Sequence, residues 1–422
     1  MENGKWITEN AKRNASRHFH GQNFNKMKSK HIYIPSFLLI FLLFSTTACA
    51  NAPFTDSGSG DNLPPPEKTA KFKVETVASN LEVVWSIVFA PDGRIFFTER
   101  PGRVRVIENG NLREKPLFTF SDVKLDGETG LMGMTLHPDF AENKLLYFAY
   151  VYDTNDGKKV RVVRFKETGE NLIQPKTIIE GISAAQYHAG MRLSFGPVDK
   201  KLYITTGDAT KQKLAQDLSS LNGKTLRLND DGTIPEDNPF IGQKDARGEI
   251  WSYGHRNAQG IAWQPETNLM FQTEHGPSLI DGVSWFKKRS GGDEVNIVER
   301  GKNYGWDKIS HLMEKDGMET PLVEYTPALA PASAVFYRGA AFPAFKGNLF
   351  FGALKGEAIV RLVIEGRKIT AQEFLLKKEF GRIREVAASP EGFIYFSTSN
   401  RDGRGDAAKE DDRILRLVPV EK

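Results

Sequence analysis

A strand–turn–strand theme that recurs along the chain is the feature that most constrains its fold. Each copy has two runs rich in β-branched or aromatic residues, and Pro, Asp or Gly lies in the turn between them. Such runs favour strands, and these turn residues supply the φ angles that tight reversals need. Six copies are visible, at residues 85–98, 134–149, 192–206, 260–273, 340–352 and 386–397. Repetition at this spacing, without a helical period, predicts a series of antiparallel sheets.

Repeated sheets protect their edges when they close into a ring. We therefore expect an all-β fold, a six-bladed β-propeller of four-stranded antiparallel blades, over residues 72–422. A solenoid or a tandem of sandwiches is the alternative. Two intervals, 207–250 and 278–335, are longer than one blade needs. Insertions on a rigid scaffold commonly carry function.

Residues 1–48 are expected to be an upstream extension followed by a signal peptide, with translation starting at Met27. The apolar run at 32–44 follows Lys28 and Lys30. It is shorter than the ~20 residues that a membrane-spanning helix needs, but it suits a secretory signal. The chain is therefore expected to be exported.

Cys49 is the single cysteine and lies at the expected cleavage point. Its surroundings resemble a bacterial lipobox, although Thr46 replaces the usual leucine. We expect a lipidated Cys49 and a flexible linker over residues 49–71, which are rich in Pro, Gly, Ser and Asp. This predicts a periplasmic or outer-membrane lipoprotein facing the periplasm, which meets the membrane only through its anchor. Ordinary signal cleavage near Ala50 is the alternative.

The net charge of +4 comes from the N-terminal segment. Outside residues 1–48 the chain has 50 basic and 51 acidic residues. A nearly neutral body gives no support for nucleic-acid binding. With one cysteine, no disulfide can form within the chain, so stability has to come from the core.

Two short motifs stand out in the second half of the chain. Residues 254–260 read GHRNAQG, and residues 274–277 read EHGP, one strand length further on. Together they offer a cation, an amide and exposed backbone carbonyls at one end of a strand pair. This combination suits an anionic cofactor held beside a hard cation such as Ca²⁺, which prefers oxygen ligands. Taken alone, a loop with an exposed arginine explains the first motif equally well.

The order of these motifs on the repeated blades resembles that of the soluble quinoprotein glucose and aldose sugar dehydrogenases, in the glucose/sorbosone dehydrogenase family. The resemblance runs from about residue 74 to about residue 418. It implies a six-bladed propeller that uses pyrroloquinoline quinone (PQQ) and Ca²⁺ to oxidise aldoses at the anomeric carbon to lactones. Electrons would pass to an external acceptor, a quinone or a cytochrome, and the protein would be a monomer or homodimer.

By this resemblance His188, in the run HAGMRL, takes the proton of the anomeric hydroxyl while hydride passes to the quinone. An imidazole has an ordinary pKa near 6.5 and can act as a base at neutral pH. Arg256 would stabilise the oxyanion that develops on the quinone, because a fixed cation acts where charge accumulates.

PQQ carries three carboxylates, and arginine pairs well with carboxylates. The resemblance assigns its binding to Glu128, Arg256, Asn257, Lys355, Arg382 and Arg384. Arg382 and Arg384 are two positions apart, so on a strand both would face one ligand. A solvated basic strand edge is the alternative for that pair.

Two calcium positions are also implied. The carbonyls of Gly276 and Pro277 would hold a catalytic ion that polarises the quinone. Glu294 and the carbonyl of Tyr304 would hold a structural ion. The neighbouring acids 293 and 294 could instead be a solvated pair.

Three departures from the family pattern bear on the substrate. The turn at 127–130 reads GETG, where relatives commonly have GQGG or GEGG, and Tyr187 lies where they often have Asn or Asp. Residues 278–290 (SLIDGVSWFKKRS) separate two motifs that relatives join almost directly. We expect this insertion to lie beside the catalytic ion, where Trp285 and Phe286 could contact substrate.

Two other classes of function remain open. A Ca²⁺-dependent propeller lactonase would share the fold and metal but would have no use for the basic cofactor residues. A propeller that binds glycans or proteins without catalysis would make His188, Arg256 and Arg384 individually dispensable.

Overall fold

A computed structural model describes residues 59–282 and 290–420. The predicted signal peptide, the start at Met27, Cys49, and Trp285 and Phe286 of the insertion lie outside the described residues. Among those described, no helix is long and apolar enough to cross a membrane.

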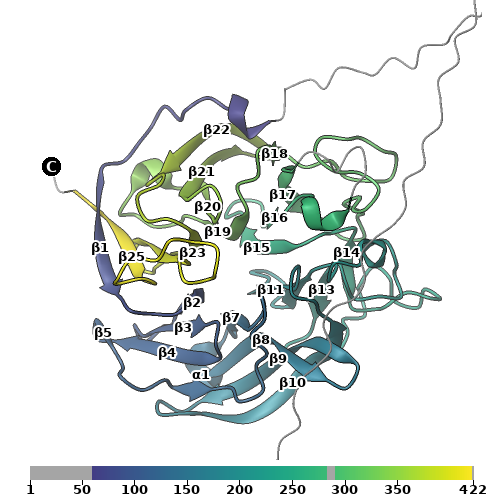
Figure 1. Cartoon of the computed structure of the whole chain (residues 1–422), viewed down its shortest axis with the longest axis horizontal. Helices are drawn as coiled ribbons and strands as arrows, with labels where there is room; N and C mark the ends of the chain where they lie inside the picture. The colour runs from purple at the N-terminus through teal and green to yellow at the C-terminus, as the bar shows by residue number, and fades with distance from the viewer. Residues whose placement is uncertain (1–58, 283–289, 421–422) are drawn as a thin grey trace, which may run out of the picture. The chain divides into compact units, whose positions relative to one another are not determined.

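Six antiparallel sheets follow one another around a ring, which confirms the predicted six-bladed β-propeller (Figure 1). The first strand of each blade contacts the first strand of the next blade, and β2 contacts β23, so the innermost strands close the circle. The strands of the first three blades are β2 (Val84–Phe89), β3 (Ile95–Glu99), β4 (Arg103–Glu108) and β5 (Asn111–Leu112); β7 (Leu131–Leu136), β8 (Leu145–Thr154), β9 (Gly157–Glu167) and β10 (Leu172–Ser183); and β11 (Gly190–Phe195), β12 (Leu202–Thr206), β13 (Lys224–Leu228) and β14 (Ile250–Tyr253).

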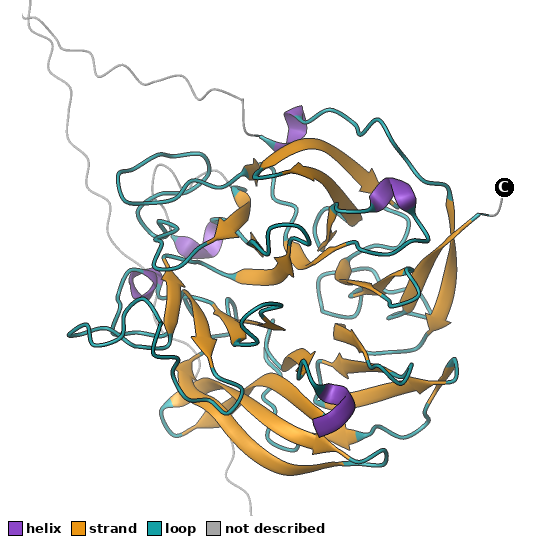
Figure 2. Cartoon of the chain, turned by 180° about the vertical axis from the view of Figure 1, so that it is seen from behind, coloured by secondary structure: helices purple, strands orange, loops and turns teal. Residues whose placement is uncertain are grey.

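The last three blades have the same antiparallel order. Their strands are β15 (Ala258–Trp263), β16 (Met270–Glu274), β17 (Asp293–Val298) and β18 (Val323–Tyr325); β19 (Pro331–Phe336), β20 (Leu349–Ala353), β21 (Ala358–Glu365) and β22 (Lys368–Leu375); and β23 (Ile383–Ala388), β24 (Ile394–Thr398), β25 (Ile414–Pro419) and β1 (Phe72–Ala78). The first blade departs from the four-stranded pattern, because the short strand β6 (Phe118–Thr119) also pairs with β4. Helical segments are short and lie before the first strand or between strands (Figure 2); they are α1 (Phe140–Asn143), η1 (Gly60–Asn62), η2 (Gln212–Ala215), η3 (Leu279–Asp281) and η4 (Pro343–Phe345).

The ring is closed by the pairing of β1 with β25, which joins the two ends of the described chain. This pairing gives the last blade its fourth and outermost strand. Residues just before β1 also contact the fifth blade. The Arg361 side chain donates to the carbonyl of Lys68 at 2.9 Å, and the backbone N–H of Gln372 donates to the carbonyl of Pro64 at 2.9 Å. Part of the segment expected to be a linker therefore lies along the fifth blade.

Apolar side chains fill the space between neighbouring blades. Strand β8 illustrates how the sequence achieves this: Tyr147, Ala149 and Val151 pack toward the third blade, whereas Phe148 and Tyr150 pack toward the first. Successive residues of a strand point to opposite faces. Because both faces of a blade are covered, its strands read as continuous apolar runs.

Candidate functional site

The candidate site lies where the innermost strands begin. The pairings Gly190 with Thr206 and Ala258 with Glu274 show that the starts of β11 and β15 adjoin the ends of β12 and β16. In each innermost strand the register shifts within the first residues. Such bulges re-aim side chains and are common beside functional sites.

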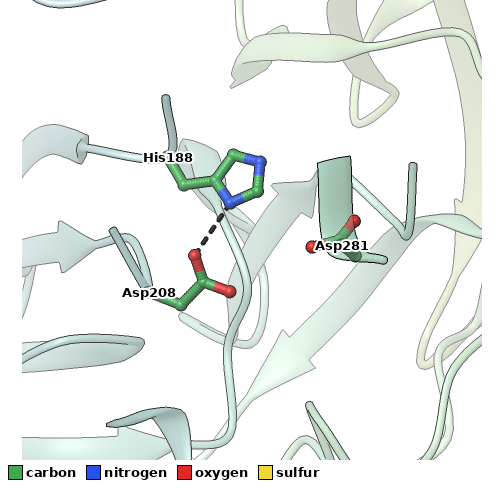
Figure 3. A group of neighbouring side chains, drawn as sticks. All are labelled: His188, Asp208 and Asp281. Atoms are coloured by element: carbon green, nitrogen blue, oxygen red, sulfur yellow. Dashed lines mark hydrogen bonds and ion pairs between the residues drawn. The ribbon is translucent and has the colours of Figure 1, made fainter. Parts of the chain in front are cut away.

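His188 and Asp208 form a buried pair at this end of the third blade. The imidazole Nδ1 lies 2.8 Å from Asp208 Oδ1, and the two side chains are 4% and 0% exposed (Figure 3). His188 precedes β11 and Asp208 follows β12, so the hairpin places them opposite each other.

Two glycines make this approach possible. A Cβ on Gly207 would lie 1.9 Å from the His188 carbonyl oxygen, and Gly190 has φ +71°. His188 itself has φ 59°, a left-handed conformation that costs a non-glycine residue of order 1 kcal/mol. The backbone is therefore held in an unfavourable conformation that directs the ring toward Asp208.

The other bonds to Asp208 determine which nitrogen of His188 can accept a proton. Oδ1 also accepts the amide of Thr210 at 2.7 Å, and Oδ2 accepts Trp306 Nε1 at 2.8 Å. The other two groups that hydrogen-bond to this carboxylate, Thr210 N and Trp306 Nε1, are donors, and an ionised carboxylate can only accept, so His188 Nδ1 must carry its hydrogen. Nε2 then has the free lone pair of a general base.

Glu128 lies beside His188 and is fixed from two sides. Its Oε2 accepts the backbone N–H of His188 at 3.3 Å, and its Oε1 pairs with Arg404 Nη1 at 2.7 Å. Burial alone would raise the pKa of Glu128, but the charges of His275 and Arg404 and the Arg404 hydrogen bond lower it to about 2. Arg404 in turn lies over the ring of Tyr187 at 5.2 Å.

Arg256 is bound mainly by other residues of the chain. Its Nη2 lies 2.7 Å from Asp281 Oδ2 and 3.0 Å from Ser278 Oγ. Its Nη1 donates to the carbonyl of His275 at 3.1 Å, and its guanidinium carbon lies 5.5 Å from the centroid of the Trp306 ring. The cation predicted to face the cofactor thus has an acidic partner from the insertion.

Asn257 and Arg384 offer donors that no other described residue uses. Asn257 Oδ1 accepts the amide of Gly190 and Gln259 Nε2, whereas its Nδ2 is buried without an acceptor among the described residues. Arg384 Nη1 lies 3.4 Å from Gln259 Oε1, and its Nε is buried without an acceptor in the same part of the chain. Burial lowers the pKa of Arg384 to about 10, so it is still a cation at neutral pH.

Arg384 borders a small cavity, and Asn257 is hydrogen-bonded to Gly190 and Gln259, which also line it. Its volume is about 10 Å³, and its lining residues are Trp85, Glu128, Met132, Ala189, Gly190, Gln259, His275, Leu354 and Arg384. Buried donors without acceptors are costly, and they fit a ligand rich in carbonyl and carboxylate oxygens such as PQQ. The space itself would hold about one water molecule, so a ring-sized ligand requires bordering side chains to move.

Arg382 and Lys355 lie differently from the other predicted cofactor residues. Arg382 pairs with Asp402 at 2.9 Å and donates to the carbonyl of Leu354 at 3.2 Å, and its side chain is buried. Lys355 is exposed just beyond β20. Arg384 borders the cavity and Arg382 does not, because the register shift between Ile383 and Val386 interrupts simple alternation.

The predicted ligands of the catalytic calcium lie at the end of β16. A Cβ on Gly276 would be 2.1 Å from the carbonyl oxygen of Gly292 and 2.3 Å from that of Gly291, so two carbonyls lie close to this glycine. The Pro277 carbonyl accepts the amide of Gly291 at 3.3 Å. A carbonyl oxygen has a second lone pair, so an oxygen-rich site for a hard cation fits here.

Glu294 lies among other acids on the fourth blade. Burial raises its pKa well above the ordinary value, and the negative charges of Glu274, Asp293 and Glu324 add to this. Tyr304 donates its hydroxyl to the carbonyl of Ile297 at 2.6 Å. A bound cation would offset the repulsion between these acids, so Glu294 fits a ligand of the predicted structural calcium, whereas the contact described for Tyr304 is made by its hydroxyl and not by the predicted carbonyl.

Asp208, Trp306 and Asp281 are site residues that the sequence reasoning missed. The pair Gly207–Asp208 directly after a strand could have indicated the first, because a glycine there permits close backbone approach. Trp306 contacts Asp208, which lies 98 residues away in the chain. Asp281 contacts Arg256, which lies 25 residues away. No local pattern marks such contacts.

Comparisons with known proteins agree with this geometry. Residues 81–415 match the family model described as Glucose / Sorbosone dehydrogenase. The chain is 33% identical to the aldose sugar dehydrogenase YliI of Escherichia coli (strain K12), over 79% of this chain and 92% of the relative. The PQQ-bound aldose sugar dehydrogenase of Streptomyces coelicolor superposes with a TM-score of 0.71 at 32% identity, over 83% of this chain and 99% of the other.

A second solved structure, the apo form of the soluble aldose sugar dehydrogenase of Escherichia coli, has a TM-score of 0.74 at 30% identity, over 83% of this chain and all of the other (100%). The resemblance found in the sequence is therefore confirmed across the whole propeller. The chain belongs to the glucose/sorbosone dehydrogenase family of sugar-oxidising enzymes.

Proposed function

We propose that the protein is a PQQ- and Ca²⁺-dependent aldose dehydrogenase that oxidises the anomeric carbon to a lactone. The observation that carries the proposal is the buried His188–Asp208 pair beside two buried donors, Asn257 Nδ2 and Arg384 Nε, that lack acceptors among the described residues. A base and unpaired donors for an oxygen-rich cofactor lie at one end of the propeller.

His188 Nε2 takes the proton of the anomeric hydroxyl as the C1–H bond breaks. Asp208 stabilises the imidazolium that results, because its carboxylate accepts the Nδ1 hydrogen at 2.8 Å. The chemistry that PQQ supplies when bound is acceptance of the hydride, and thus of two electrons, at its ortho-quinone.

Arg384 and Asn257 would hold the oxygens of PQQ, and Glu128, Arg256, Lys355 and Arg382 lie around the same end of the ring. The carbonyls of Gly276 and Pro277 would hold the catalytic Ca²⁺, and Glu294 with Tyr304 the structural ion. We also propose export and anchoring through Cys49, with electrons leaving to an external quinone or cytochrome; these proposals rest on the sequence.

The test is dye-linked oxidation of a panel of aldoses by the purified protein, with and without PQQ, and with Ca²⁺ or a chelator. We expect oxidation only with both PQQ and Ca²⁺. Turnover without PQQ would contradict the proposal. Absence of PQQ binding would contradict it as well, and would favour the glycan- or protein-binding alternative.

A further inference from the structure

Asp281 is buried where its neighbours in the chain are exposed. It ends η3, in the described part of the insertion at 278–290. Leu279 and Ile280 are 85% and 50% exposed, whereas the Asp281 side chain is 1% exposed. Burying a carboxylate while two apolar side chains face solvent is the reverse of what hydrophobicity favours.

The position of Asp281 is set by described contacts on both sides. Ser278 and Asp281 form a capping box, in which the Ser278 amide donates to Asp281 Oδ2 at 2.7 Å. The Asp281 carbonyl accepts Gln212 Nε2 at 2.7 Å, which ties the turn to the third blade. The carboxylate is thus held in place within the site.

The ion pair with Arg256 leaves acceptor positions on Asp281 Oδ1 and one Nη1 hydrogen of Arg256 available to a ligand. Arg256 uses Nε and Nη2 on Asp281 and Ser278, and Nη1 on a backbone carbonyl. A carboxylate has about four acceptor positions. Asp281 Oδ2 takes most of the short bonds, and among the described residues Oδ1 has only contacts of 3.3 Å to Arg256 Nε and 3.5 Å to Gln212 Nε2.

The carboxylate is also close to the proposed base. Ligand-capable atoms of His188, Asp208 and Asp281 lie within 4.8 Å of one another (Figure 3). A metal ion there would have to break the His188–Asp208 and Arg256–Asp281 bonds. A sugar whose anomeric hydroxyl is bonded to His188 Nε2 would instead extend toward Asp281, because a pyranose ring is about as wide as this separation.

We propose that Asp281 is a specificity-determining residue that selects substrates by charge, favouring aldoses with an amino group and disfavouring aldoses with an acid group. This inference rests on the proposed function. An ammonium group can donate to the free acceptor positions of Asp281, whereas a uronate carboxylate meets like charge. A neutral hydroxyl can donate to the same atoms, so neutral aldoses rank between the two.

Binding of methyl glycosides separates this inference from catalysis, because they have no free anomeric hydroxyl and cannot be oxidised. The Kd values of methyl glucosaminide, methyl glucoside and methyl glucuronide are measured calorimetrically on the protein loaded with PQQ and Ca²⁺. The variants are Asp281→Asn, Asp281→Glu and a control, Asp237→Asn. Asp237 pairs with Arg227 at 2.7 Å, as Asp281 pairs with Arg256, but at the other end of the blade strands.

We expect the wild type to prefer the amino glycoside over the acid glycoside, and Asp281→Asn to lower this preference about tenfold or more. A ligand ammonium that donates to Asp281 lies about 3 Å from its charge, and at that distance one charge has an effect of this size even at the dielectric constant of water. Asp281→Glu should keep the order of preference, and Asp237→Asn should leave the ratio unchanged. The ratio of kcat/KM for glucosamine and glucuronate should follow the Kd ratio.

A ratio that changes less than twofold in Asp281→Asn, or equally in Asp237→Asn, would overturn the inference, as would failure to bind any glycoside. If Asp281→Asn changes the Kd ratio but the wild type oxidises no aldose, the charge selection stands and the proposed function fails. If aldoses are oxidised and the ratio is insensitive to Asp281, the proposed function stands and this inference fails.

Discussion

Replacing Asp208 by Asn tests the role of the buried pair, because all donors facing the carboxylate must then meet an amide. The carboxylate accepts three hydrogen bonds of 2.7 to 2.8 Å, from His188 Nδ1, Thr210 N and Trp306 Nε1. Asn has one acceptor oxygen and one NH₂ group. The NH₂ group must face either Trp306 or His188, and in the second case it favours the tautomer whose Nε2 is protonated.

The size of the effect follows from these contacts. A hydrogen bond to a charged group contributes about 1.5–3 kcal/mol. At an effective dielectric constant near 20, a carboxylate ~4 Å from the imidazolium stabilises it by up to ~4 kcal/mol. We therefore expect Asp208→Asn to lower kcat by about 100- to 1000-fold, which corresponds to ~2.7–4 kcal/mol.

The assay is steady-state oxidation of the best aldose from the panel by the protein loaded with PQQ and Ca²⁺, with PQQ affinity measured separately. Asp237→Asn is the control, since it makes the same chemical change away from the site. The expected result is a large loss of kcat with PQQ affinity within a few-fold of the wild type. A kcat within threefold of the wild type would refute the assignment of Asp208 as the partner that holds and stabilises His188.

Two further predictions concern the charged residues around the cavity. In a fluorescence titration, Arg384→Met should weaken PQQ binding about 10- to 150-fold, the equivalent of one charge-assisted hydrogen bond. The control Arg367→Met removes an ion pair with Glu299 on an exposed surface and should leave the Kd for PQQ unchanged. Equal effects of the two substitutions would count against a cofactor role for Arg384. Glu128 has a folded pKa of about 2 against an ordinary 4.5, so its stabilisation is present above pH 4.5 and lost as pH falls toward 2. The wild type should therefore lose about 2 kcal/mol relative to Glu128→Gln between pH 6 and pH 3 in denaturant unfolding; a constant difference would show that the carboxylate is not held as described.

The fold could be predicted because the sequence signals of its strands and turns lie within short stretches of the chain. Alternating side chains such as Tyr147 and Phe148 show a strand covered on both faces, and the turns between runs follow from their Pro, Asp and Gly residues. The extra strand β6 carries no comparable signal, since it has two residues and depends on pairing with β4.

Much less of the site could be predicted. His188, Asn257 and Arg384 lie in recognisable runs, and the structure brings them to one end of the ring. The partners that define their chemistry come from other segments: Asp208 for His188 and Asp281 for Arg256. These pairings depend on blade packing and on the turn of the insertion, so no spacing rule reports them. Arg382 and Arg384 were expected to face one ligand because residues two apart on a regular strand point to the same side. The bulge between Ile383 and Val386 interrupts this alternation.

The most direct test of the account is a single-turnover experiment on His188→Gln and the wild type. Both proteins are loaded with PQQ and Ca²⁺, an aldose is added without any electron acceptor, and the absorbance of the bound quinone is followed. We predict that both proteins bind PQQ and that sugar reduces the quinone rapidly in the wild type but at least 100-fold more slowly in His188→Gln. Equal reduction rates in the two proteins would contradict the assignment of His188 as the base, and loss of PQQ binding in His188→Gln would show that its role is structural.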